Sequence, residues 1–155
     1  MVYWLTIDAD ILSFRIERPG ALSLLFCPDF DCRWDAHYPV DPSPLSVVAH
    51  ESSPRARAAH PGVEPFEGRR LTLSPIQEET SRPTELSKLG GKPGYVQRGA
   101  VGREYEAKGL EFLLQIDDTA RLKGYRSAFS HGTVYVFTRI EGDRLTTLAA
   151  FYESS

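Results

Sequence analysis

Alternating apolar and polar positions predict strands near the start of the chain. Three runs there are rich in β-branched and aromatic residues, at positions 2–7, 11–16 and 21–26. In the third run, Leu22, Leu24 and Phe26 recur at every second position and should share one face. The sequence Asp8-Ala9-Asp10 between the first two runs is typical of a tight turn.

The last third of the chain carries the clearest pattern. Residues 110–116 form a nearly continuous apolar run, as expected of a central strand buried on both faces. Residues 132–140 alternate, which places two groups of side chains on opposite faces. The groups are Val134, Val136 and Thr138 on one side, and Tyr135, Phe137 and Arg139 on the other. A further strand at 145–152 follows a predicted hairpin turn at Glu141-Gly142-Asp143.

The middle of the chain is poor in regular patterns. Seven prolines lie between positions 28 and 65, and proline prevents long elements there. Residues 45–49 fit a strand or a helical turn, residues 51–62 a long loop, and residues 71–73 a short strand. Residues 76–89 are the best helical candidate, broken by Pro83, with Thr84 capping a short piece at 85–89 that Gly90-Gly91 ends.

These elements predict one domain, residues 1–155, of the α+β class. We expect it to be β-rich, with mostly antiparallel sheets, a few short helices and a long proline-rich loop region. A chain of 155 residues can bury enough surface to fold without a disulfide or metal.

The net charge of −3 bears on which kind of macromolecule the protein can bind. Nucleic-acid binding relies on a basic field, so no nucleic-acid partner is expected. A mildly acidic protein is better matched to a basic protein partner. No apolar run reaches the ~18 residues of a membrane span, and the N-terminus lacks signal-peptide features, so we expect a cytoplasmic protein without membrane contact.

The only metal-like spacing joins Cys27, Cys32 and His37 in a C-x4-C-x4-H pattern. Zinc hooks usually have two to four residues between cysteines and need three or four ligands, which His50 and His60 could complete. A buried cysteine at the end of an apolar strand more often acts as a small hydrophobic residue. We therefore expect no metal and no cofactor, although these three residues leave a metal site open.

No motif identifies a catalytic site. A histidine beside a serine or cysteine could form a nucleophile pair, but the chain has no G-x-S-x-G or comparable signature. The glycine-rich stretch from Gly90 to Gly94 resembles a phosphate cradle only superficially. Proline follows Lys92 where a phosphate-binding loop needs serine or threonine, so this stretch is predicted to be a structural turn.

Acidic residues are the best candidates for contacting a cationic partner. Asp117 and Asp118 follow the predicted central strand, where paired carboxylates can also act as acid and base or cap a turn. The full candidate set is Glu78, Glu79, Glu104, Glu106, Asp117 and Asp118.

Three short motifs occur in order between positions 84 and 140. They read S-K-L-G-G-x-P-x-x-x-Q, then F-L-L-Q-I-D, then G-T-V-Y-V-F. In this respect the chain resembles the YwqG-like family of bacterial domains of unknown function. The resemblance implies a β-rich α+β fold and no particular enzyme activity. Domains of this kind also look like immunity proteins of bacterial toxin systems, which bind and neutralise a cognate toxin.

We therefore expect an immunity protein, not an enzyme, that occludes a secreted bacterial effector, with a nuclease as one possible effector. The protein itself should be a monomer or weak homodimer. Two alternatives remain open. One is a small hydrolase using Asp117, Asp118 and a histidine. The other is a ligand-sensing or structural domain that associates through an exposed strand edge.

Overall fold

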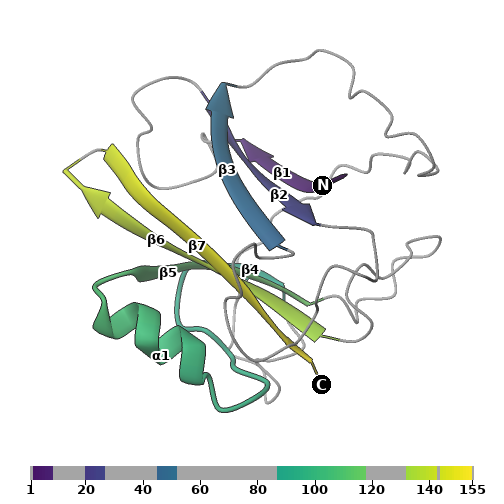
Figure 1. Ribbon diagram of the computed structural model, residues 1–155, viewed down its shortest axis with the longest axis vertical. Coiled ribbons are helices and arrows are strands. Elements are labelled where there is room, and N and C mark those ends of the chain that lie inside the picture. Colours follow the sequence, from purple (N-terminus) through teal and green to yellow (C-terminus); the bar gives the residue numbers. More distant parts are fainter. Residues whose placement is uncertain are drawn as a thin grey trace.

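The computed structural model describes residues 2–8, 20–26, 45–51, 87–117, 132–142 and 144–154. These residues form two antiparallel sheets and one short helix (Figure 1), which confirms the β-rich α+β class. The first sheet contains β1 (Val2–Asp8), β2 (Gly20–Phe26) and β3 (Leu45–Glu51). The second contains β4 (Lys88–Leu89), β5 (Glu111–Asp117), β6 (Gly132–Glu141) and β7 (Arg144–Ser154), and the helix is α1 (Ala100–Ala107).

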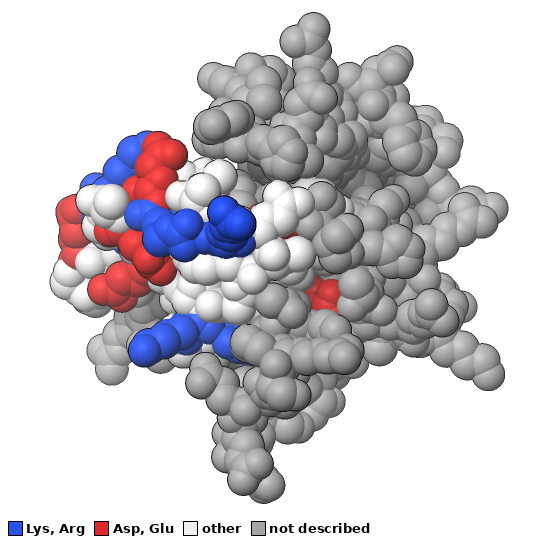
Figure 2. All heavy atoms as spheres, turned by 90° about the horizontal axis from the view of Figure 1, so that it is seen from below, with Lys and Arg blue, Asp and Glu red and all other residues white. Residues whose placement is uncertain are grey.

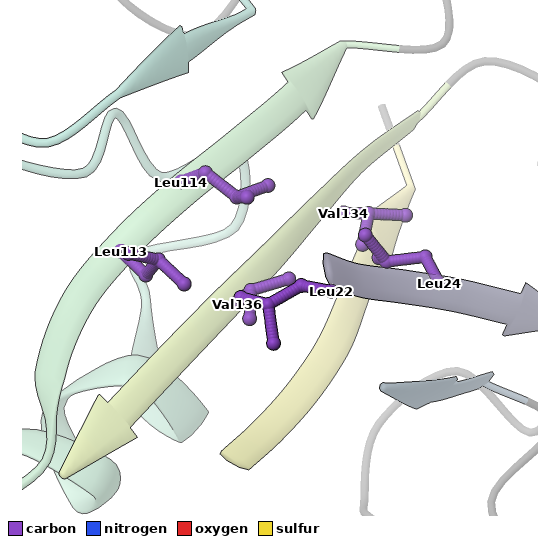
Figure 3. Packing of buried hydrophobic residues seen from close by; sticks show 6 residues of the cluster. All are labelled: Leu22, Leu24, Leu113, Leu114, Val134 and Val136. Atoms are coloured by element: carbon purple, nitrogen blue, oxygen red, sulfur yellow. The ribbon is translucent and has the colours of Figure 1, made fainter. Parts of the chain in front are cut away.

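The described elements stack in three layers. One face of the second sheet packs on the first sheet through a core that includes Leu22 and Leu24 of β2 with Val134 and Val136 of β6 (Figure 3). The other face of the second sheet packs on α1 and on the segment that precedes it. The second sheet is therefore the middle layer. It is apolar on both faces, whereas a sheet with one face in water would carry polar side chains on that face.

The first sheet has the strand order β1-β2-β3. Its strands confirm the predictions at 2–7 and 21–26, and they show that residues 45–49 belong to a strand and not to a helical turn. The predicted shared face of β2 is also confirmed for Leu22 and Leu24, which are both fully buried in the core between the sheets.

The second sheet has the order β4-β5-β6-β7, so the apolar run at 110–116 forms a central strand as predicted. A register shift lies between Phe112 and Leu114. As in a β-bulge, the extra residue breaks the simple alternation. Leu113 and Leu114 consequently both join the core between the sheets, while Phe112 packs on the helix side.

Strand β6 confirms the alternation predicted from its sequence. Val134 and Val136 lie in the core between the sheets, whereas Tyr135 and Phe137 lie in the core beneath α1. The predicted hairpin to β7 is also present, because Glu141 pairs with Arg144 across the turn. Gly142 takes a φ of 69° there, a conformation that favours glycine.

The prediction of a helical piece at residues 85–89 is wrong for its last two residues. Lys88 and Leu89 form the short strand β4, paired with Gln115 and Leu114 of β5. Pairing with the edge of β5 satisfies backbone groups that a one-turn helix would leave open, and this outweighs the weak local signal from Thr84. The remainder of the predicted helix, residues 76–86, lies outside the described residues.

The glycine-rich stretch is a structural turn, as predicted. Gly90 and Gly91 have φ values of 72° and 76°, and Gly90 N donates to Leu113 O at 2.7 Å. The two glycines let the chain leave β4 and turn toward the helix side of the sheet.

Several predicted features fall outside the described residues. They are the strands at 11–16 and 71–73, the turn at Asp8-Ala9-Asp10 beyond its first residue, and all of the 51–62 loop except Glu51. Within the described part of the chain, no helix is long and apolar enough to cross a membrane.

Candidate functional site

Of the six acidic residues predicted to contact a partner, the structure describes three, and these three do not lie together. Glu104 and Glu106 are exposed on α1, whereas Asp117 ends β5 and is only 5% exposed. Strand β5 starts beside the helix and runs away from it, so Asp117 lies about 20 Å along the strand from Glu111. Glu78, Glu79 and Asp118 lie outside the described residues.

Both helical glutamates already have partners within the protein. Glu104 Oε1 lies 2.6 Å from Lys108 Nζ, one turn further along α1. The Tyr95 hydroxyl donates to Glu106 Oε1 at 3.2 Å. The hydrogen bond that Lys108 donates to Glu104 raises the pKa of Lys108. Glu104 is therefore part of an ion pair, whereas Glu106 accepts only from an uncharged hydroxyl.

Buried polar side chains hold the segment Gly94–Gln97, which we call the pinned segment, against the sheet. Gly94 N donates to Gln115 Oε1 at 2.8 Å, and Gly94 O accepts from the Tyr135 hydroxyl at 2.8 Å. Val96 N donates to the same hydroxyl oxygen at 3.1 Å. Each bond links the pinned segment to β5 or β6, so its backbone has one preferred position.

The end of the pinned segment is fixed by a buried acid. Gln97 N donates to Glu153 Oε2 of β7 at 2.8 Å, although Glu153 is only 5% exposed. Sequence analysis did not identify this network. The one local signal was Gln115, a polar residue inside the apolar run at 110–116.

The two tyrosines of this region stay protonated, which suits their role as donors. Burial raises the pKa of Tyr135 well above its usual value, and the carboxylate of Glu153 raises it further. Burial likewise raises the pKa of Tyr95, with Glu106 adding to the effect. The two rings lie 5.4 Å apart between centroids, so Tyr95 bridges the helix side and the sheet.

Removing the Tyr135 hydroxyl tests the pinned segment. In Tyr135→Phe, Gly94 O loses its donor and Val96 N loses its acceptor, so we expect a loss of about 1–3 kcal/mol in unfolding free energy. Amide exchange at Val96 should accelerate. The matched control is Tyr105→Phe, whose hydroxyl has no hydrogen-bond partner among the described residues. Equal effects of the two changes in urea unfolding would contradict the role assigned to Tyr135.

Aromatic packing and a cap from the sheet fix the C-terminal half of helix α1. Tyr105 packs edge-on against Phe137 and Phe151, each at a centroid distance of 5.7 Å. At the C-terminal end the Arg139 guanidinium of β6 donates to Lys108 O and, at 3.4 Å, to Gly109 O. These carbonyls lie where a helix lacks internal donors, so Arg139 caps α1 from the sheet.

Two buried carboxylates lie in one row across the far end of the sheet. Asp117 pairs with Thr133, and Thr133 pairs with Glu153, so all three residues share the helix-side face. Paired carboxylates can act as acid and base. Asp117 and Thr133 have partners within the protein, and Glu153 accepts from the pinned segment, so the row has a structural role in this fold.

A serine and a histidine meet on the other sheet. Ser23 Oγ lies 2.7 Å from His50 Nε2 and 2.8 Å from Thr6 Oγ1, which links β1, β2 and β3. This is the spacing of a nucleophile and its base. Ser23 is 0% exposed and lies in the middle of a central strand, however, so a substrate cannot reach it in this structure.

The remaining candidate ligands are scattered or undescribed. His50 lies on β3, while Cys27, Cys32, His37, His60 and His131 lie outside the described residues. Among the residues that the structure describes, no three histidine, cysteine or acidic side chains lie close enough together to hold a metal ion.

The exposed surface around α1 carries charges of both signs. Figure 2 shows red and blue side chains next to one another on the side where α1 lies. The exposed charged residues from the pinned segment to the start of β5 are Arg98, Arg103, Glu104, Glu106, Lys108 and Glu111. This surface is polar and mixed in charge, and it is mounted on a helix that aromatic packing and buried hydrogen bonds hold in place.

Comparisons with known proteins leave the family open. No protein-family model matches the chain, and searches of curated proteins and of solved structures found no match either.

Proposed function

We propose that this protein acts by binding another protein, and that it is an immunity protein that neutralises a cognate bacterial effector. The observation that carries the proposal is the rigid mounting of the exposed face of α1. Its support comes from Tyr105 packing, the Arg139 cap and the pinned segment. A surface that is already ordered loses little entropy on binding, so more of its contact energy appears as affinity.

The mechanism in this proposal is occlusion. The α1 surface covers the active site of the effector, or a surface that the effector needs for assembly. The mixed charges of this surface suit a polar interface rim, where they guide encounter and orientation. The resemblance of residues 84–140 to YwqG-like domains supports the same assignment, because the first of its three motifs ends with the pinned segment, which directly precedes α1.

The first test is recovery of the partner. The tagged full chain is produced in its native host together with the product of the neighbouring gene. Bound protein is purified, identified by mass spectrometry and quantified against the tagged chain. The proposal expects one partner in fixed stoichiometry. Association with this partner should slow as salt is added, because exposed charges contribute to encounter. No stoichiometric partner, or an association rate that salt does not change, counts against the proposal.

The alternative is a small hydrolase, and the Ser23–His50 hydrogen bond is the observation that favours it. A fluorophosphonate probe labels serine nucleophiles that are both activated and accessible. Because Ser23 is fully buried, we expect the probe not to label Ser23. The wild-type chain and the Ser23→Ala variant should therefore give the same signal. Labelling that depends on both Ser23 and His50 would favour the hydrolase and count against the immunity proposal.

A further inference from the structure

Strand β7 forms an open edge of the second sheet. Among the described strands it pairs with β6 alone, because it ends the order β4-β5-β6-β7 (Figure 1). It is 11 residues long, which makes it the longest of the edge strands that the structure describes. The outward side of an edge strand offers backbone N–H and C=O groups to any other strand that reaches it.

Solvent reaches β7 from this edge. Val136 and Phe137 of β6 are both 0% exposed, but their partners across the strand pair, Ala150 and Ala149 of β7, are only half-buried. Ala150 packs against the core between the sheets, whereas Ala149 packs against the core beneath α1. The two alanines thus lie on opposite faces of a sheet that is covered on both faces. Their shared exposure therefore comes from the edge.

The middle of β7 lacks the features that ordinarily prevent strand edges from pairing. These features are charged side chains, proline and bulges. The register shift of β7 lies at Thr146, near the hairpin, and the following residues pair regularly with β6. Residues 147–151 contain neither a charge nor a proline, since the charged residues of β7, Arg144 and Glu153, lie outside this stretch. We call residues 147–151 the open stretch.

We infer that the open stretch pairs antiparallel with the open stretch of a second copy of this chain, about a two-fold axis at Ala149. In this register Leu148 lies opposite Ala150 of the second copy, and Thr147 lies opposite Phe151. Each of these pairs sets a larger side chain against a smaller one. Like charges directly opposite one another destabilise a strand pair, and an uncharged stretch that faces its own copy avoids them.

A second copy fits this edge better than a strand of another protein. It offers an edge of the same length and the same twist, and the pairing requires no further feature of either molecule. Pairing about a two-fold axis also uses the same edge on both copies, so the assembly closes at a dimer. The inference goes beyond the proposed function and does not depend on it.

The dimer should be weak and reversible. One pair of strands makes a small interface compared with the roughly 1,200–2,000 Å² of stable complexes. The dimer fraction should therefore rise with protein concentration.

Sedimentation velocity over about a hundredfold range of protein concentration tests the inference. We expect the wild-type chain to shift from monomer to dimer. Ala149→Lys places two like charges opposite one another at the two-fold axis, so it should raise the dissociation constant by about tenfold or more. The control is Val48→Lys, which places the same charge on the edge strand β3, where Val48 is 43% exposed. The control should dimerise as the wild type does.

Hydrogen exchange of the wild-type chain gives a second answer that does not depend on a variant being folded. Peptides that cover the open stretch should exchange more slowly as the protein concentration rises, whereas those that cover β3 should not change. A wild-type chain that stays monomeric across the range overturns the inference. A dimer that a folded Ala149→Lys variant retains also overturns it, as does concentration-dependent protection on β3 instead of β7. A monomer that still binds an effector leaves the proposed function standing.

Discussion

Replacing Phe137 with alanine should lower the unfolding free energy by about 3–5 kcal/mol. Phe137 is 0% exposed and lies at the centre of the helix-side core. Its ring meets those of Tyr105, Phe112 and Phe151, at centroid distances of 5.7, 5.7 and 5.9 Å. The change leaves a cavity beneath α1, so it removes packing from the sheet and from the helix together.

Urea unfolding followed by circular dichroism measures this loss. The control is Phe137→Leu, which retains most of the apolar volume and should cost about 1 kcal/mol. Natural domains are stable by only about 5–15 kcal/mol, so the alanine variant should be close to unfolding at moderate temperature. A loss below 1 kcal/mol for Phe137→Ala would contradict the packing of α1 on this face.

Replacing Gly99 with alanine should have the second large effect, about 2–4 kcal/mol of destabilisation. Gly99 has a φ of 62°, and a Cβ placed there would lie 2.2 Å from Tyr95 Cδ2. The substitution therefore combines backbone strain with a clash against a ring that also contacts Tyr135.

A matched control isolates the clash. Gly91 has a φ of 76°, but a Cβ there meets nothing within 4 Å. Gly91→Ala should therefore show the strain alone, about 1 kcal/mol. In a Tyr95→Ala background, Gly99→Ala should cost no more than Gly91→Ala, because the clashing ring is gone. Equal costs for Gly99→Ala and Gly91→Ala in the wild-type background would show that Tyr95 does not pack on Gly99.

The strands could be predicted from the sequence because their signals are local. Alternation along β6 fixed the assignment of Val134 and Val136 to one face and of Tyr135 and Phe137 to the other. The hairpin at Gly142 and the turn at Gly90 depend on glycine at positions with a positive φ. Such features require only neighbouring residues, so no knowledge of the rest of the fold was needed.

Helix α1 was not predicted, because its stability comes from distant contacts. Gly102 and Val101 are weak helix formers, and the N-cap Gly99 offers no side-chain cap. The helix instead relies on Tyr105 packing against Phe137 and Phe151, and on Arg139 at its C-terminal end. The available local signals were modest: the i, i+4 pair Glu104 and Lys108, and Gly109 after the last turn.

The buried polar network was also beyond local prediction. Its bonds join residues 21 to 56 positions apart, from Gly94 with Gln115 to Gln97 with Glu153. For the same reason the sequence did not reveal that Asp117 is buried, since a carboxylate at a strand end is ordinarily exposed. The pairing of Glu104 and Glu106 with internal partners likewise became visible only in the folded chain.

Growth of bacteria that produce the recovered partner tests the central claim most directly. The partner is produced under an inducible promoter, alone, with the wild-type chain, or with an Arg98→Ala/Arg103→Ala variant, which removes two exposed charges from the surface around α1. The account predicts that the partner alone arrests growth, that the wild-type chain restores it, and that the variant restores it poorly at equal protein levels. A partner that is harmless alone, or whose toxicity the wild-type chain leaves unchanged, would contradict the assignment as an immunity protein.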